Sequence, residues 1–200
     1  MKMLLKIMGI IVMMFVLLMV IGYWTGKIVV ESSGYYSDFV QLDKSLQKRV
    51  MAASDLDSLK ADDNVYTLQP KQLKQYLSSR GKVLIYSYIP YCTRNNCISP
   101  LEAYQKCKNA EVELMLIAEG YHKLFENTAK YPQPVFMIDS QFFGTDIREE
   151  YVYRFYSCLV GFGKWHRFNG GLYFCFNHGC FIKQCEKIDD ALKFLKETDK

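Results

Sequence analysis

The sequence predicts an α/β domain that follows a single N-terminal transmembrane helix. Apolar, β-branched runs alternate with helical segments along most of the chain, a pattern typical of a sheet flanked by helices. Residues 7–24 contain no charge, and a helix of that length extends roughly 27 Å, about the thickness of the hydrocarbon core of a bilayer. Half of all residues are hydrophobic and 23% are charged, which excludes a disordered or collagen-like chain.

The first 24 residues are expected to act as an uncleaved signal anchor, with residues 4–24 in the membrane. Lys2 and Lys6 precede the apolar run, so the positive-inside rule places the N-terminus in the cytoplasm and the domain outside it. In a bacterium, that compartment is the periplasm. Gly22-Tyr23-Trp24 closes the run with interfacial aromatic residues rather than with the small residues of a cleavage site. The alternative is a cleaved signal peptide, which would release the same domain into the same compartment.

The charge of the chain argues against nucleic acid as a partner. The formal net charge of +4 includes the two N-terminal lysines, so the remainder is close to neutral. It contains no basic block suited to neutralising phosphates. The oligomeric state is left open by the sequence.

Residues 25–68 are expected to form a polar spacer that holds the domain away from the bilayer. One amphipathic helix is predicted within it, because five apolar residues recur near helical spacing: Phe39, Val40, Leu42, Leu46 and Val50. Binding of a partner by this helix is the alternative role.

The domain itself is predicted over residues 69–200. Its first half has the order of a β-α-β unit, which pairs two parallel strands. Pro70 suits the first turn of a helix and Ser99 suits an N-cap. The four predicted elements are a helix at 70–80, a strand at 82–88, a helix at 100–109 and a strand at 112–118.

The second half is predicted to end in a β-hairpin and a helix. Asn177-His178-Gly179 is a tight-turn signal, and Asp189 and Asp190 suit the positive end of a helix. Residues 145–170 are interpreted as an insertion whose central part is ambiguous but favours a helix. The predicted elements are a helix at 121–130, a strand at 134–139, a helix at 147–160, strands at 172–176 and 180–184, and a helix at 189–196.

The residues best suited to chemistry directly follow the strand at 82–88, and reactive sites in α/β sheets form at such carboxyl ends. Cys92 precedes a helix N-terminus, whose partial positive charge favours a thiolate, and Arg94 could add to this effect. Cys97 could attack a mixed disulfide formed on Cys92, so the two could cycle between dithiol and disulfide.

The order of the predicted elements and the position of Cys92 make residues 69–196 resemble the thioredoxin superfamily. Cys92 stands where the nucleophilic cysteine of that family stands, and Pro100 matches its helix proline. Pro134 resembles the family's cis-proline, which packs beside the reactive cysteine and helps to hold the substrate backbone. The resemblance implies a thioredoxin-like three-layer α/β/α sandwich with a mixed sheet, protein thiols or disulfides as substrates, and no organic cofactor.

The cysteine spacing departs from the family's Cys-x-x-Cys motif. Tyr91 replaces the usual tryptophan, Asn95 occupies the usual resolving position, and Cys97 lies two residues further on. Five residues of continuous helix turn about 140° net, so a Cys92–Cys97 disulfide requires residues 93–96 to form a loop.

Because the cysteine spacing departs from the family's motif, two other classes of function remain as alternatives to disulfide exchange. The domain could be a redox-inactive binding or assembly module whose disulfides are structural. Copper delivery is a lesser alternative, because paired exported thiolates bind soft metals, although no histidine or methionine lies near Cys92 in the sequence.

The remaining cysteines are expected to be structural. Cys175, Cys180 and Cys185 recur every five residues, and steps of five alternate between the faces of a strand, which disfavours a zinc site. A disulfide within this set, with Cys158 as a further partner, is expected instead. Cys107 is expected to be a buried free thiol.

The sequence also suggests roles for two acidic residues, the histidines and the aromatic residues of the insertion. Glu119 and Asp139 follow strands and could assist proton transfer to Cys97, with capping or solvent exposure as the alternative. The three histidines have no spacing that indicates a metal site, and His178 is expected to be exposed. The aromatic residues of the insertion are expected in the core, or, where exposed, in a docking patch: Tyr151, Tyr153, Phe155, Tyr156, Phe162, Trp165 and Phe168.

Overall fold

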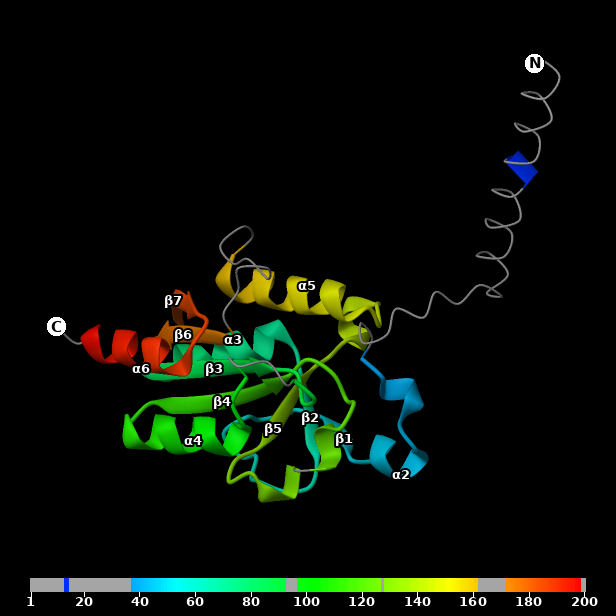
Figure 1. Ribbon diagram of the computed structural model, residues 1–200, viewed down its shortest axis with the longest axis horizontal. Coiled ribbons are helices and arrows are strands. Elements are labelled where there is room, and N and C mark those ends of the chain that lie inside the picture. Colours follow the sequence, from blue (N-terminus) through cyan, green and yellow to red (C-terminus); the bar gives the residue numbers. More distant parts are fainter. Residues whose placement is uncertain (1–12, 15–36, 93–96, 127, 162–171, 199–200) are drawn as a thin grey trace, which may run out of the picture. The chain divides into compact units, whose positions relative to one another are not determined.

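The computed structural model describes residues 13–14, 37–92, 97–126, 128–161 and 172–198 (Figure 1). The chain divides into two compact units, residues 1–34 and 35–200. The predicted membrane span falls in the first unit, of which only Met13 and Met14 are described, both of them helical. Within the described ranges, every helix is too short or too polar to cross a bilayer.

The described part of the second unit contains a mixed seven-stranded sheet, which confirms the predicted α/β class. The strands are β1 (Val50–Ala52), β2 (Val65–Leu68), β3 (Lys82–Tyr88), β4 (Glu113–Ala118), β5 (Val135–Ile138), β6 (Tyr173–Asn177) and β7 (Cys180–Cys185). Their spatial order is β1-β2-β5-β4-β3-β6-β7. The first five strands run parallel, and the β6–β7 hairpin adds two antiparallel strands beside β3.

The predicted β-α-β unit is present at the centre of this sheet. Helix α4 (Pro100–Asn109) connects β3 to β4, and the two strands pair in parallel from Val83↔Glu113 to Tyr88↔Ala118. The Ser99 side chain caps α4 by accepting a hydrogen bond from the Glu102 N–H at 3.1 Å. Because capping and apolar patterning are local properties, both boundaries of α4 agree with those predicted.

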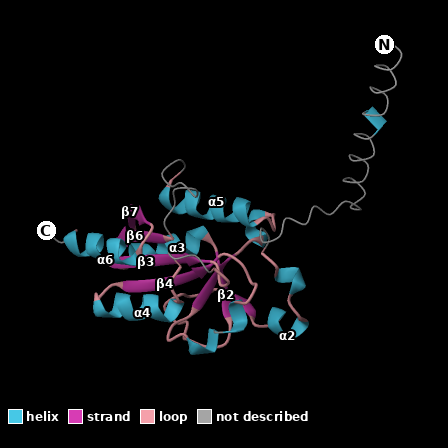
Figure 2. Cartoon of the chain, viewed as in Figure 1, coloured by secondary structure: helices cyan, strands magenta, loops and turns pink. Residues whose placement is uncertain are grey.

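Helices cover both faces of the sheet (Figure 2). Successive strand residues point to opposite faces, and in β6 Cys175 contacts Ala191 of α6 (Ile188–Glu197). Its neighbour Phe174 stacks on Tyr156 of α5 (Arg148–Val160), with 4.2 Å between the ring centroids. Helix α6 therefore lies on one face and α5 on the other. Helix α3 (Pro70–Ser78) packs against α5, whereas α4 lies on the opposite side of the sheet from α5.

The segment expected to be a spacer contributes to the sheet instead. Residues 50–68 supply β1 and β2, and Val65 and Leu68 are fully buried. The single amphipathic helix predicted here is also wrong. Two short turns replace it, η1 (Phe39–Gln41) and α2 (Lys44–Gln47), because Leu42 between them is extended.

The helix predicted at 121–130 does not form. Two short 3₁₀ turns take its place, η2 (Leu124–Glu126) and η3 (Thr128–Lys130). Lys123 has a φ of 59°, a left-handed conformation that interrupts any right-handed helix. The apolar spacing in this segment serves core contacts, since Tyr121 and Leu124 are buried.

The β6–β7 turn confirms the predicted hairpin and depends on Gly179. His178 and Gly179 have φ values of 47° and 75°, the left-handed pair that a two-residue hairpin turn requires. A Cβ atom at Gly179 would also lie 2.9 Å from the Ser78 Cα in α3.

We expect Gly179→Ala to destabilise the protein by about 2–4 kcal/mol, from left-handed strain and overpacking together. Gly144→Ala is the matched control, because Gly144 has a φ of 65° and a Cβ atom added there would meet nothing within 4 Å. That variant should lose only about 1 kcal/mol. Urea denaturation of the full chain measures both, and equal losses would contradict a role for the Ser78 contact.

Candidate functional site

Cys92 and Cys97 form a disulfide at the carboxyl end of β3, with their Cα atoms 6.2 Å apart. This confirms the predicted pairing of the C-x4-C cysteines. Both residues are half-buried. Residues 93–96, including Arg94 and the loop on which the prediction depended, lie outside the described residues.

Hydrogen bonds hold both ends of this disulfide loop near the end of β3. The Cys92 N–H donates to the Ile89 carbonyl at 2.9 Å, closing a turn directly after the strand. The Tyr86 hydroxyl donates to the Ile98 carbonyl at 2.8 Å, just before the N-cap of α4. The disulfide is therefore held between the end of a central strand and the N-terminus of α4, where unpaired backbone N–H groups favour negative charge.

Arg148 connects α5 to the residue that precedes Cys92. Its Nη1 donates to the Tyr91 hydroxyl oxygen at 2.7 Å, and the Tyr91 ring meets His122 edge-on at 5.0 Å. Arg148 is only 7% exposed and begins α5, where the helix dipole disfavours a cation. Sequence reasoning missed this residue, although a basic residue in the first turn of a predicted helix was a usable signal.

Glu119 is a buried carboxylate at the same edge of the sheet. It is 7% exposed, its N–H donates to the Tyr88 carbonyl at 2.9 Å, and its Oε1 accepts from the Ser87 hydroxyl at 2.7 Å. The Tyr151 hydroxyl donates to its backbone carbonyl. Solvent exposure, one of the two alternatives to a proton-transfer role, does not apply to Glu119.

Asp139 has a structural role instead. Its Oδ1 accepts from the Phe142 N–H at 3.1 Å, which caps the following turn η4 (Gln141–Phe143). Its Oδ2 accepts from the Gln69 side chain at 3.0 Å. Oδ1 thus caps a local turn, as the capping alternative predicted, while Oδ2 binds a side chain at the start of α3.

Pro134 does not have the cis peptide bond expected from the resemblance, since no peptide bond among the described residues is cis. It precedes β5, which is parallel to β3 and separated from it by β4. In the register, Val135 lies level with Leu116 and hence with Tyr86, whereas Cys92 lies beyond the end of β3. The structure therefore does not bring Pro134 together with the two cysteines.

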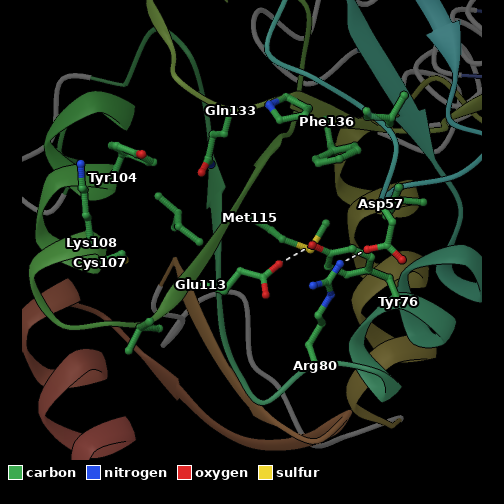
Figure 3. A pocket seen from close by; sticks show the side chains of 15 residues that line it. Asp57, Tyr76, Arg80, Tyr104, Cys107, Lys108, Glu113, Met115, Gln133 and Phe136 are labelled. Carbon is green, nitrogen blue, oxygen red and sulfur yellow. Dashed lines mark hydrogen bonds and ion pairs between the residues drawn. The ribbon is translucent and has the colours of Figure 1, made fainter.

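Pro134 lines a separate pocket between α3, α4, β4 and β5 (Figure 3). The charged groups of this pocket largely pair with one another. Arg80 forms an ion pair with Asp57 and lies over the Tyr76 ring at 4.5 Å, and the Tyr76 hydroxyl donates to Glu113. Burial is the main cause that raises the pKa of Tyr76, and Glu113 adds to it. These mutual contacts point to a structural role.

The disulfide expected among the C-terminal cysteines is absent. All four candidates are free thiols, with Cys158 and Cys180 exposed and Cys175 and Cys185 buried. Cys158 lies on α5, across the sheet from the face that Cys175 presents to α6. Cys107 is the buried free thiol that was predicted, and burial raises its pKa to about 12.

Cys175 and Cys185 affect each other's ionisation. A hydrogen bond from the Cys175 thiol lowers the pKa of Cys185. The same hydrogen bond, together with burial, raises the pKa of Cys175. In the described part of the chain, no group of three or more histidine, cysteine or acidic residues is placed to hold a metal ion.

The exposure of the described histidines and aromatic residues agrees in most cases with the predictions. His178 is exposed in the hairpin turn as predicted, and His122 is exposed as well. Tyr151, Phe155 and Tyr156 are fully buried in the core, whereas Tyr153 is 46% exposed. The other predicted members of these sets lie outside the described residues: Phe162, Trp165, His166 and Phe168.

No protein-family model matches this chain, and no curated protein matches it.

Proposed function

We propose that this protein is a membrane-anchored, extracytoplasmic thioredoxin-like protein that exchanges disulfides with the thiols of other proteins. Cys92 is the attacking thiolate and Cys97 is the resolving thiol. The disulfide between them supports this function most directly, because it joins the end of β3 to the N-terminus of α4. Backbone N–H groups at a helix N-terminus favour a thiolate beside them once the disulfide opens.

The arrangement of the sheet is compatible with a thioredoxin-like three-layer sandwich. The parallel β3-α4-β4 unit, the antiparallel hairpin beside β3 and the closing helix α6 support this assignment. Two features depart from it: β5 lies between β2 and β4, and β1 extends the edge. Pro134 has no part in the proposed substrate groove, since its peptide bond is trans and β5 is not adjacent to β3.

The exchange reaction proceeds in two balanced steps. The Cys92 thiolate attacks a substrate disulfide, so an S–S bond forms between Cys92 and the substrate while the second substrate sulfur leaves as a thiolate. Cys97 then loses its proton and attacks the Cys92 sulfur, which closes the Cys92–Cys97 disulfide and releases the reduced substrate. Two electrons pass to the substrate, and the reverse sequence oxidises a substrate dithiol.

Glu119 is the group we assign to the proton of Cys97. It is buried beside the end of β3, from which the disulfide loop departs, and a carboxylate can act as general base for a thiol within its reach. Its hydrogen bond from Ser87 holds the carboxylate in place.

A redox titration of the full chain tests the proposed function. The protein is equilibrated in glutathione buffers, its thiols are alkylated, and mass spectrometry maps which cysteines have changed. We expect the Cys92–Cys97 disulfide to open reversibly between roughly −120 and −270 mV, the range of exchange proteins. A disulfide that stays closed to below about −300 mV would contradict exchange and indicate a structural bond.

That second outcome would favour the other candidate function, a tethered binding or assembly module. The half-buried position of both cysteines supports it, because a half-buried disulfide is less open to attack by a protein thiol. Copper delivery by Cys92 and Cys97 is the third candidate, and it requires their disulfide to be reduced first.

A further inference from the structure

Cys175 of β6 and Cys185 of β7 form a second pair of thiols, remote from the Cys92 loop. Cys185 lies opposite Tyr173 and Cys175 lies opposite Lys183, so the two cysteines are diagonal neighbours on one face of the hairpin. The Cys175 thiol also lies 3.8 Å from the carbonyl oxygen of Ala191 in α6. Cys175 is fully buried and Cys185 is 6% exposed, and both of their strands pack against α6 (Figure 1).

The register of this pair suits a bridging ion better than a disulfide. Diagonal residues on paired strands have Cα atoms about 7–8 Å apart, whereas a disulfide requires roughly 4.4–6.8 Å. Both thiols are free in the structure. Two metal–sulfur bonds of about 2.3 Å each, the length of a zinc–thiolate bond, separate the sulfur atoms by up to about 4.6 Å. Side chains at diagonal positions on one face can span that separation, because their Cβ atoms lie closer together than their Cα atoms.

We propose that Cys175 and Cys185 form a two-thiolate site for a soft monovalent ion, Cu(I) or Ag(I). Thiolates select soft ions, and both of these ions accept two ligands in a line. No third histidine, cysteine or acidic ligand joins the pair among the described residues. Zn(II) requires four ligands and is therefore not a match for this donor set.

The surroundings suit the charge of such a complex. Binding of one monovalent ion releases two thiol protons and leaves a complex of charge −1. Lys183 lies directly opposite Cys175, and its ammonium group lies 4.8 Å from the centroid of the Phe194 ring of α6. This cation can offset the negative charge. Cys185 lies on β7, an edge strand of the described sheet, and is the more exposed of the two cysteines.

A competition experiment with Cu(I) tests the site. The full chain in detergent carries Cys92→Ser and Cys97→Ser, so that the other thiol pair cannot bind, and is loaded anaerobically with Cu(I) against the chelator bicinchoninate. We expect one equivalent of Cu(I) to be retained, and Cys175→Ala or Cys185→Ala to weaken its binding at least about 100-fold. Cys158→Ala and Cys180→Ala, which remove the exposed thiols, are the matched controls and should retain it.

Retention that survives the loss of Cys175 and Cys185, or that is lost with Cys158 or Cys180, would overturn the assignment. Equal retention of Zn(II) would overturn it as well. Where a core variant fails to fold, X-ray absorption on the unsubstituted chain, with its Cys92–Cys97 disulfide intact, decides the question. Two sulfur neighbours around copper are expected there, and any other ligand set contradicts the site.

Discussion

Cys92→Ser is expected to abolish reduction of insulin disulfides by the full chain, with a loss of at least about 100-fold. A serine hydroxyl is almost fully protonated at neutral pH and cannot replace the thiolate as nucleophile. The rate is followed by the turbidity of the released insulin chain, with a thiol reductant to recycle the protein. Turnover that is unchanged in this variant would refute the assignment of Cys92.

The control for this experiment is Cys158→Ser. Cys158 is an exposed free thiol on α5, so its removal tests whether any accessible cysteine supports the reaction. We expect this variant to keep the full rate. Thermal unfolding of both variants separates loss of the nucleophile from loss of the fold, because removal of the Cys92–Cys97 cross-link also removes its contribution to stability.

Cys97→Ser is expected to make mixed disulfides between Cys92 and substrate proteins accumulate. Without the resolving thiol, the mixed disulfide between Cys92 and a substrate protein cannot be released from within the chain. Non-reducing gels of membranes that contain this variant should show high-mass species that disappear on addition of a reductant.

The double variant Cys92→Ser/Cys97→Ser is the control, and it should trap nothing. Species that persist in the double variant would come from the other five cysteines, of which Cys158 and Cys180 are exposed. A folded Cys97→Ser protein that traps no partner would count against a resolving role for Cys97. Together with a disulfide that resists reduction, that result would favour a binding module.

Local sequence signals predicted the central part of the fold well. The boundaries of β3 and α4 agree with the predicted 82–88 and 100–109, because a continuous apolar run and a Ser-Pro cap are read within a few residues. The hairpin turn at His178 and Gly179 was equally readable, since its backbone conformation favours those residue types.

Short and irregular elements were not predictable in this way. β1 has three residues and is largely exposed, too short for an alternating pattern to emerge, so residues 50–68 resembled a spacer. The segment at 121–130 has helical apolar spacing, but the left-handed Lys123 divides it. In both segments, contacts with distant parts of the chain outweigh local propensity.

The candidate chemistry follows from the amino-acid sequence alone: two cysteines after a strand, next to a capped helix, with an acidic residue at the end of the neighbouring strand. Which residues meet depends on the three-dimensional arrangement. Glu119 is buried next to Ser87, Arg148 binds Tyr91, and Pro134 lies away from the cysteines. Cys175 and Cys185 lie on one face of the hairpin. These contacts could not be read from any single segment, because strand order and register are set by burial summed over the whole sheet.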